Sequence, residues 1–86
     1  MDWSVYILRC SDGSYYVGYS NDAEKRLEIH NAGKGAKYTR SRLPCEMVYT
    51  EQFASKNEAM SREYQVKKLN RTSKQALIDR QSSPTT

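Results

Sequence analysis

Residues 3–20, WSVYILRCSDGSYYVGYS, determine the first half of the fold. Two runs rich in aromatic and β-branched residues, 3–9 and 15–20, lie on either side of Ser11-Asp12-Gly13-Ser14. Residues of these types favour strands, and an Asp-Gly pair between two such runs is a strong signal for a tight turn. The stretch therefore predicts an antiparallel β-hairpin.

Two registers of this hairpin are compatible with the turn residues. A two-residue Asp12-Gly13 turn would place Tyr6 and Tyr16 on opposite faces, because side chains alternate along a strand. A three-residue loop with Gly13 in the left-handed conformation instead sets Tyr6 opposite Gly18 and makes the two tyrosines diagonal neighbours. We prefer this second register because it gathers apolar residues on the other face, namely Val5, Ile7 and Val17. Gly18 then opens a hollow beside Tyr6.

The middle of the chain is expected to form a helix, a loop and a strand. A capping box at Asn21-Asp22-Ala23-Glu24 predicts a helix that ends near Asn31-Ala32-Gly33, where glycine tolerates the left-handed conformation. The glycine-rich basic segment 33–44 follows as a loop. Residues 46–53 alternate as a third strand, with Met47 and Tyr49 on one side.

Two further capping boxes predict two helices in the last part of the chain. Ser55-Lys56-Asn57-Glu58 opens a helix to about residue 69, and Thr72-Ser73-Lys74-Gln75 opens a shorter one to about residue 80. The order β-β-α-β-α-α predicts an α+β fold, a three-stranded antiparallel β-sheet flanked by helices. We expect a single domain over residues 1–80 and a flexible tail over 81–86. The residues assigned to the core or its borders are Trp3, Leu8, Met47, Tyr49, Met60, Val66, Leu69, Leu77 and Ile78.

Length and charge narrow the class of protein. The 86 residues fit one small domain, and 14 Lys plus Arg against 10 Asp plus Glu give a net charge of +4, so a polyanion is an expected partner. No apolar run is long enough to span a bilayer and no signal peptide is visible, so we expect a cytoplasmic protein. Cys10 and Cys45 are too few for a disulfide scaffold and are expected to be reduced, buried thiols.

Five residues supply the side chains that phosphodiester cleavage requires. Arg26 and His30 are spaced i, i+4 and share one helix face, and Glu63 lies on the next long helix. Glu63 can hold Mg²⁺, which makes a bound water more acidic, and Arg26 can donate a forked pair of hydrogen bonds to a phosphate. A tyrosine, Tyr6 or Tyr16, or else His30 can accept the proton of the nucleophile. Taken singly, each of these residues also fits an ordinary structural role.

The order and spacing of four segments carry a family resemblance. The segments SVYILR, YYVGYS, EKRLEIH and REYQVKKL together resemble the GIY-YIG nuclease superfamily, and most of all its small stand-alone bacterial members of the URI type. The resemblance extends from Trp3 to Ile78. It differs in two places: the first motif begins with Ser4 in place of glycine, and Asn70 is the nearest candidate for an asparagine that many members carry near the end of the domain.

The resemblance implies a role for each of the five residues. Tyr6 would be the general base or its close partner, and Tyr16 would help to place the water or the phosphate. Arg26 matches the catalytic arginine of the family, and His30 matches a histidine present in some branches. Glu63 matches the glutamate that binds the divalent metal, Mg²⁺ or Mn²⁺.

The basic loop predicts a nucleic-acid-binding surface beside this site. It follows directly on the helix that carries Arg26 and His30, and the segment 33–44 holds no acidic residue. Its cations would neutralise phosphates and its tyrosine would stack on an unpaired base. The residues concerned are Lys34, Lys37, Tyr38, Arg40 and Arg42.

Together these features predict a metal-dependent endonuclease that hydrolyses DNA phosphodiester bonds, with structured substrates in DNA repair or recombination as the expected setting. The alternative is a catalytically weak or inactive nucleic-acid-binding module on the same fold. A third possibility is an interaction of the basic loop with an acidic protein partner. We expect DNA as the partner, no contact with a membrane, and a monomer or weak homodimer.

Overall fold

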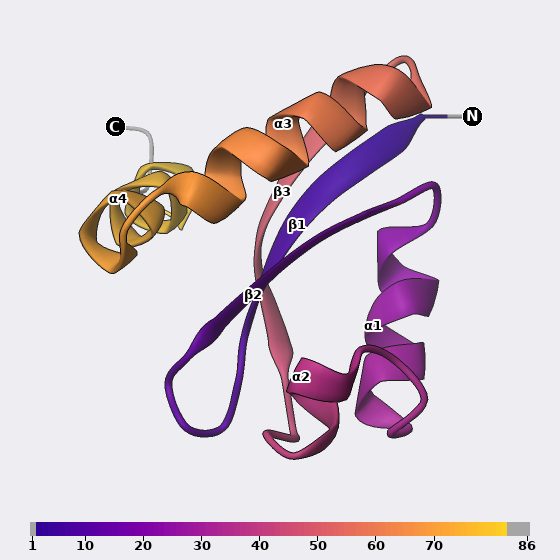
Figure 1. Ribbon diagram of the computed structural model, residues 1–86, viewed down its shortest axis with the longest axis vertical. Helices are drawn as coiled ribbons and strands as arrows, with labels where there is room; N and C mark the ends of the chain where they lie inside the picture. Colours follow the sequence, from indigo (N-terminus) through magenta and orange to yellow (C-terminus); the bar gives the residue numbers. More distant parts are fainter. Residues whose placement is uncertain (1, 83–86) are drawn as a thin grey trace.

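Three antiparallel strands form the centre of the molecule, in the order β2-β1-β3 (Figure 1). The computed structural model describes residues 2–82. The elements along the chain are β1 (Trp3–Arg9), β2 (Tyr15–Ser20), α1 (Ala23–Asn31), α2 (Lys37–Arg40), β3 (Glu46–Phe53), α3 (Lys56–Lys68) and α4 (Arg71–Ser82). The predicted α+β fold is confirmed. The short helix α2 is an addition, because the basic segment was predicted to be a loop throughout.

The hairpin adopts the three-residue register. Tyr6 pairs with Gly18 across the β1–β2 ladder. The Cys10 N–H donates to the carbonyl of Ser14 at 2.8 Å, and Gly13 has a φ of +84°, in the left-handed region that glycine tolerates. The preferred register of the sequence analysis is therefore confirmed.

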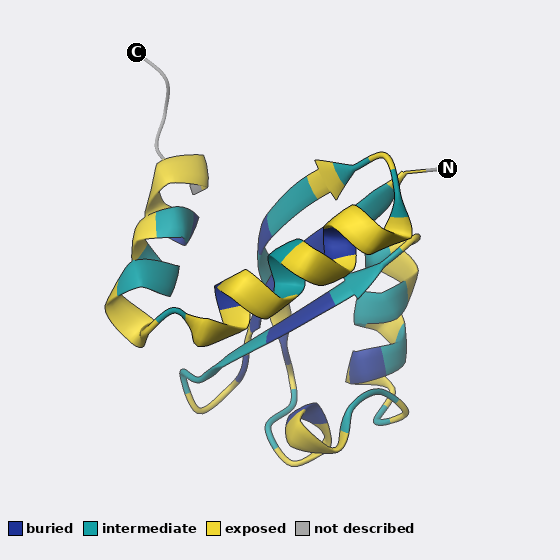
Figure 2. Cartoon of the chain, turned by 45° about the horizontal axis from the view of Figure 1, so that its top comes forward, coloured by how far each residue is buried: buried dark blue, intermediate teal, exposed yellow. Residues whose placement is uncertain are grey.

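The two faces of the sheet are covered by different helices. On one face, Val5 and Ile7 pack with residues of α3 and α4, and on the other, Tyr6 and Leu8 pack with Leu27 of α1. Figure 2 shows the buried residues along the middle of the strands and on the inward sides of α1 and α3. The alternation of β1 thus sends Tyr6 toward α1, where the predicted Arg26 and His30 also lie.

A bulge in β3 corrects the predicted faces of this strand. Ile7 pairs with Tyr49, but the next residue, Leu8, pairs with Met47, so Val48 is an extra residue in the ladder. Tyr49 packs in the cluster of Ile7, whereas Met47 packs against the cluster of Leu8. Met47 and Tyr49, predicted on one side, therefore lie on opposite faces.

Two helix caps also differ from the prediction. Helix α1 is capped by Asp22, whose carboxylate accepts from the Lys25 N–H, and not by Asn21. Helix α4 starts after Asn70, whose side-chain oxygen accepts from the Ser73 N–H at 2.8 Å. Ser55 is confirmed as the cap of α3, since its Oγ accepts from the Glu58 N–H, but the Glu58 carboxylate accepts from the Ser55 hydroxyl and not, as in a capping box, from the Ser55 N–H.

The last part of the chain departs from the prediction in two ways. Met60 on α3 is 42% exposed and does not belong to the core. Helix α4 continues to Ser82, two residues into the segment predicted as a tail, and residues 83–86 lie outside the described part of the chain. Within residues 2–82, no helix is long and apolar enough to cross a membrane.

Candidate active site

A pocket of about 310 Å³ beside the edge strand β2 collects four of the five predicted catalytic residues. They come from four elements: Tyr6 from β1, Tyr16 from β2, Arg26 from α1 and Glu63 from α3. Because α1 and α3 cover opposite faces of the sheet, the pocket lies where the two faces meet around β2. The full lining is Trp3, Tyr6, Tyr16, Gly18, Tyr19, Arg26, Lys56 and Glu63.

Gly18 allows Tyr6 to reach this pocket. A Cβ added at position 18 would lie 2.6 Å from the Tyr6 hydroxyl oxygen and 2.7 Å from its Cζ, far inside van der Waals contact. The phenol of Tyr6 therefore occupies the space that any other residue at 18 would need. The space beside Tyr6 that was predicted at Gly18 is present, and the hydroxyl fills it.

His30 lies behind Tyr6 and not in the pocket wall. It is fully buried, and its Nε2 is 3.1 Å from the Tyr6 hydroxyl oxygen. Its ring is also tilted against that of Tyr16, with the centroids 5.1 Å apart. The structure thus brings His30 to the predicted site, but as a contact of the two tyrosines and not as a wall of the pocket.

The other ring nitrogen of His30 is held by helix α2. Nδ1 lies 2.9 Å from Oγ1 of Thr39, and that hydroxyl donates to the carbonyl of Ala36 at 2.9 Å. A hydroxyl that has given its proton to a carbonyl can accept from an Nδ1–H, so we assign the proton to Nδ1 and leave Nε2 free to accept from Tyr6. The Ala36 N–H reaches Nδ1 only at 3.4 Å, a weaker contact than the Thr39 bond.

Both partners of the Tyr6–His30 bond are neutral at physiological pH. Burial lowers the pKa of His30 from its usual 6.5, and the charge of Arg26 lowers it further. Burial raises the pKa of Tyr6 to about 12, and Tyr16 adds to this while the Arg26 guanidinium opposes it. The Tyr6 hydroxyl therefore keeps its proton and donates a hydrogen bond to Nε2 of the neutral His30 imidazole.

Glu63 and Arg26 give the pocket its opposite charges. The Glu63 side chain is 17% exposed and pairs with Nζ of Lys67, one turn along α3, at 3.5 Å. Arg26 forms no ion pair with any described carboxylate, so its guanidinium is available to an anion.

A divalent metal would find one protein ligand in this pocket. Residues 2–82 contain no group of three or more His, Cys, Asp or Glu side chains suited to a metal. Mg²⁺, however, usually keeps several waters and takes only one or two carboxylates together with substrate phosphates. Glu63 therefore fits as the protein ligand of a metal that a phosphate and waters also coordinate.

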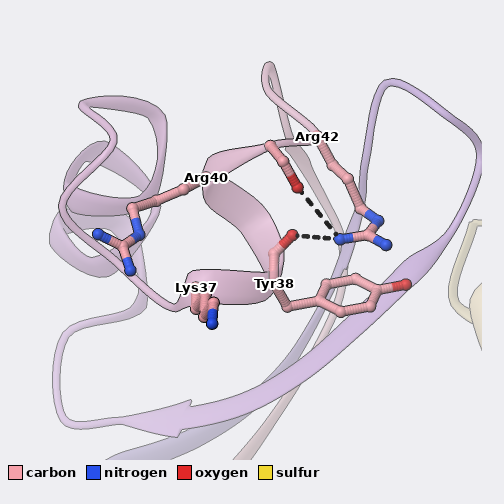
Figure 3. A pocket seen from close by; sticks show the side chains of 5 residues that line it. Lys37, Tyr38, Arg40 and Arg42 are labelled. Carbon is pink, nitrogen blue, oxygen red and sulfur yellow. Dashed lines mark hydrogen bonds between the residues drawn. The ribbon is translucent and has the colours of Figure 1, made fainter.

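The predicted basic surface surrounds α2 (Figure 3). Tyr38 stacks on Tyr16 of the pocket, with ring centroids 6.1 Å apart, and the Arg42 guanidinium lies 4.0 Å from the Tyr38 ring centre. Arg42 also pairs with Asp12 at 3.0 Å and bonds the carbonyl of Tyr38, so it holds the ring in place. The structure thus connects Tyr38 and Arg42 to the predicted catalytic residues.

The three other cations of this surface are less constrained by contacts within the chain than Arg42 is. Lys37 and Arg40 are exposed and form no ion pair with a described residue; in Figure 3 the Arg40 side chain points away from Tyr38. Lys34 follows α1 and does not line the pocket of the tyrosines.

The two departures from the family motifs have structural explanations. Ser4 is buried in the ladder, where it pairs with Ser20 of β2, so it packs inside the sheet and does not line the pocket. Asn70 caps α4 through its bond to Ser73 and is also absent from the pocket lining. No residue of the described chain takes the place of the asparagine in this pocket.

Four residues of the site were not singled out from the sequence. Thr39 holds His30, and Trp3, Tyr19 and Lys56 line the pocket. Trp3 was assigned to the border of the core, which is only part of its role. A signal existed for Lys56, because a lysine in the first turn of a helix opposes the helix dipole.

Comparisons with known proteins show which family and fold the chain matches. Residues 2–76 match the family described as the GIY-YIG catalytic domain. The UPF0213 protein VNG_2274C of Halobacterium salinarum is 56% identical over 74 residues, which cover 86% of this chain and 96% of the relative. The solution NMR structure of the UPF0213 protein BH0048 from Bacillus halodurans is similar with a TM-score of 0.63 and 50% identity, covering 98% of this chain and 89% of that one. That of EF2693 from E. faecalis gives a TM-score of 0.64 at 39% identity, covering 100% and 92%.

Proposed function

The chain belongs to the GIY-YIG family of nucleases, and we propose that it is a metal-dependent endonuclease that hydrolyses DNA phosphodiester bonds. The observation that carries the proposal is the convergence of the Tyr6 hydroxyl, the Arg26 guanidinium and the Glu63 carboxylate on one pocket. These groups are a base, an anion-binding group and a metal ligand, the set that hydrolysis of a phosphodiester uses.

Tyr6 and His30 would act together on the attacking water. Tyr6 keeps its proton at neutral pH, since its pKa is raised to about 12, so it cannot accept a proton unless it gives one away. His30 Nε2, 3.1 Å from the hydroxyl oxygen, is the acceptor. As the water attacks, its proton passes to the Tyr6 oxygen while the phenolic proton passes to His30. The Nδ1–H bond to Thr39 then supports the imidazolium.

Arg26 and Tyr16 would hold the phosphate. The Arg26 guanidinium can donate two hydrogen bonds to phosphate oxygens, and these bonds strengthen as negative charge develops in the transition state. Tyr16 also lines the pocket and can donate one more. Their contribution is to orient the phosphorus toward the water that Tyr6 contacts.

Glu63 would hold the Mg²⁺ or Mn²⁺ ion. When bound, such an ion polarises a phosphoryl oxygen and lowers the pKa of a coordinated water. Nζ of Lys67 lies 3.5 Å from Oε2 of the same carboxylate, so it would compete with the ion for Glu63.

DNA would approach across α2. Lys37 and Arg40 supply positive charge on α2, the helix that also carries Tyr38, and neither forms an ion pair with a described residue. Tyr38 in turn stacks on Tyr16. Such charges contact phosphates without reading base sequence, so the surface suits substrates recognised by their structure, as in DNA repair or recombination.

A second candidate function is a nucleic-acid-binding module with little catalysis. The observation that favours it is the engagement of Glu63 by Lys67, together with the use of Asn70 as a helix cap. In this case the basic surface would bind DNA, but the pocket would not catalyse cleavage.

A cleavage assay separates the two functions. Purified protein with Mg²⁺ or Mn²⁺ is incubated with linear duplex, single-stranded, flapped and four-way DNA, and products are resolved on a denaturing gel. The nuclease predicts metal-dependent products that disappear in Glu63→Gln and persist in Glu24→Gln, which changes an exposed carboxylate on α1 outside the pocket. Binding of these DNAs without any product would favour the inactive module.

A further inference from the structure

We propose that Trp3, Tyr19 and Lys56 form a nucleobase subsite in the candidate pocket. The subsite would hold the base of a nucleotide that flanks the phosphate bound near Tyr6 and Arg26. The inference rests on the proposed function for its ligand, a nucleic acid strand, but it concerns residues to which that function assigns no role.

The three residues meet because of the strand register and the start of α3. Val5 pairs with Tyr19 across the hairpin, which makes Trp3 and Tyr19 diagonal neighbours on the face that α3 covers. Their ring centroids are 6.1 Å apart at an interplanar angle of 40°. Lys56, the first residue of α3, places its Nζ 5.7 Å from the centre of the Trp3 ring.

Helix stability does not explain the position of Lys56. A cation in the first turn of a helix opposes the helix dipole, whereas Glu58 in the same turn complements it. Lys56 is exposed and forms no ion pair with any residue of the described chain. Its contact in the structure is the ring of Trp3, on the wall of the pocket.

Packing against the core accounts for only part of the surface of the two aromatic side chains. Trp3 and Tyr19 are half-buried and pack against the core on the α3 face, yet both also line the pocket. The buried edges of the two rings are sufficient for packing against the core. The ring surface that lines the pocket lies beside the Lys56 cation and next to the proposed phosphate site, and core packing does not account for it.

This combination suits a nucleotide better than a small anion. Aromatic rings stack on nucleobases because every base has a flat π face, and a lysine beside the stack can contact the adjoining phosphate. A free phosphate would use Lys56 and Arg26 but would leave both rings without a partner. Along β2, Tyr16 precedes Gly18 and Tyr19 follows it, so a strand held near Tyr6 meets an aromatic residue in each direction.

Trp3 itself reports on the subsite, because it is the single tryptophan of the chain. Full-length protein in EDTA, which prevents cleavage, is titrated with a thymidine hexanucleotide and with an abasic phosphodiester of the same length and charge. We expect the base-bearing oligomer to quench Trp3 emission and to bind about 5-fold to about 100-fold more tightly than the abasic one. Equal quenching and equal affinity, or no change with either oligomer, would overturn the subsite.

Variants of Tyr19 on β2 and of Lys56 on α3, with matched controls on α3, test the subsite without replacing Trp3. Tyr19→Leu and Lys56→Ala should each reduce the affinity for the base-bearing oligomer, and Tyr19→Leu should also reduce its preference over the abasic one. The controls are Tyr64→Leu and Lys68→Ala, because Lys68 lies 4.4 Å over the exposed Tyr64 ring, outside the pocket lining. Equal losses in both pairs would contradict the proposal, and thermal unfolding checks that each variant is folded.

The two proposals can fail separately. A protein that cuts DNA but shows no difference between the two oligomers remains a nuclease and loses the subsite. A protein that shows base-dependent quenching of Trp3 but cuts no DNA keeps the subsite and loses the nuclease function.

Discussion

The hydroxyl of Tyr6 lies 3.1 Å from Nε2 of His30, and neither residue could be used as proposed without the other. Tyr6 holds its proton because burial raises its pKa to about 12, and His30 is neutral because burial lowers its pKa. The His30 ring is fully buried, so a proton would reach it through the groups that it contacts, Tyr6 among them. The pair therefore transfers the function of a base from an inaccessible histidine to a phenol at the pocket.

The first prediction concerns the pH dependence of stability. The native state keeps His30 neutral at pH values where the unfolded chain, with a pKa near 6.5, has already bound a proton. The unfolded state then binds more protons, so the free energy of unfolding falls as the pH drops below about 6.5, by at most about 1.4 kcal/mol per pH unit. Urea unfolding of wild type and His30→Gln between pH 7.5 and about pH 5 measures this, and parallel curves would contradict it.

The second prediction concerns Thr39, which accepts the bond from Nδ1 of His30. Thr39→Val keeps the volume but leaves the buried Nδ1–H without its partner, so we expect a loss of about 1–3 kcal/mol in stability. The rate of cleavage should fall as well, because the imidazolium loses its support. Thr39→Ser retains the hydroxyl and should restore the rate. If Thr39→Val and Thr39→Ser cut equally fast, the bond has no part in the reaction.

The hairpin and its role at the site were predictable because local signals agree there. Asp12-Gly13 marks the turn, the flanking runs favour strands, and the opposition of Tyr6 and Gly18 follows from the loop length. Arg26, His30 and Glu63 were predictable from their spacing and from the family motifs. Their placement around Tyr6 was not, because Arg26 and His30 lie on α1 and Glu63 lies on α3, and only tertiary packing brings these two helices to β1.

The parts that could not be predicted lack a local signal. Helix α2 has no side-chain cap, and its inward residue Thr39 is held by His30, nine residues earlier in the chain. The bulge at Val48 adds one residue to the ladder without any change in composition. Trp3 has the chemistry of a core residue, and only the position of Lys56 against the helix dipole indicated a ligand surface.

The third prediction concerns the close approach at Gly18. Gly18→Ala places a methyl group 2.6 Å from the Tyr6 oxygen, so the ring must shift, and we expect a loss of about 1–3 kcal/mol in unfolding free energy. Cleavage should fall more steeply than stability, since the shifted hydroxyl no longer faces the pocket. In the background of Tyr6→Leu the same substitution has no ring to displace, so most of its stability cost should vanish in a double-mutant cycle. Additive costs would show that the contact is not the cause.

The fourth prediction concerns the basic surface. Lys37→Ala and Arg40→Ala should each weaken DNA binding and reduce the slope of log affinity against log salt by about 0.7 to about 0.9, the loss of one phosphate contact. Arg80→Ala removes an exposed charge from α4, which lies against the other face of the sheet, and should leave the slope unchanged. Fluorescence anisotropy at several salt concentrations measures the slopes. Equal slopes for all three variants and wild type would rule out this surface.

The fifth prediction concerns the competition for Glu63. Lys67 pairs with this carboxylate at 3.5 Å, and the lysine side chain is half-exposed, so water and salt already weaken the pair. Lys67→Ala should lower the Mg²⁺ concentration for half-maximal cleavage by about two-fold to about five-fold, the range expected from an exposed ion pair. Lys68→Ala removes the same charge one residue away without freeing Glu63, so it should leave the metal requirement unchanged. If Lys67→Ala needed a higher Mg²⁺ concentration for half-maximal cleavage, Lys67 would help to bind the substrate and would not compete with the metal for Glu63.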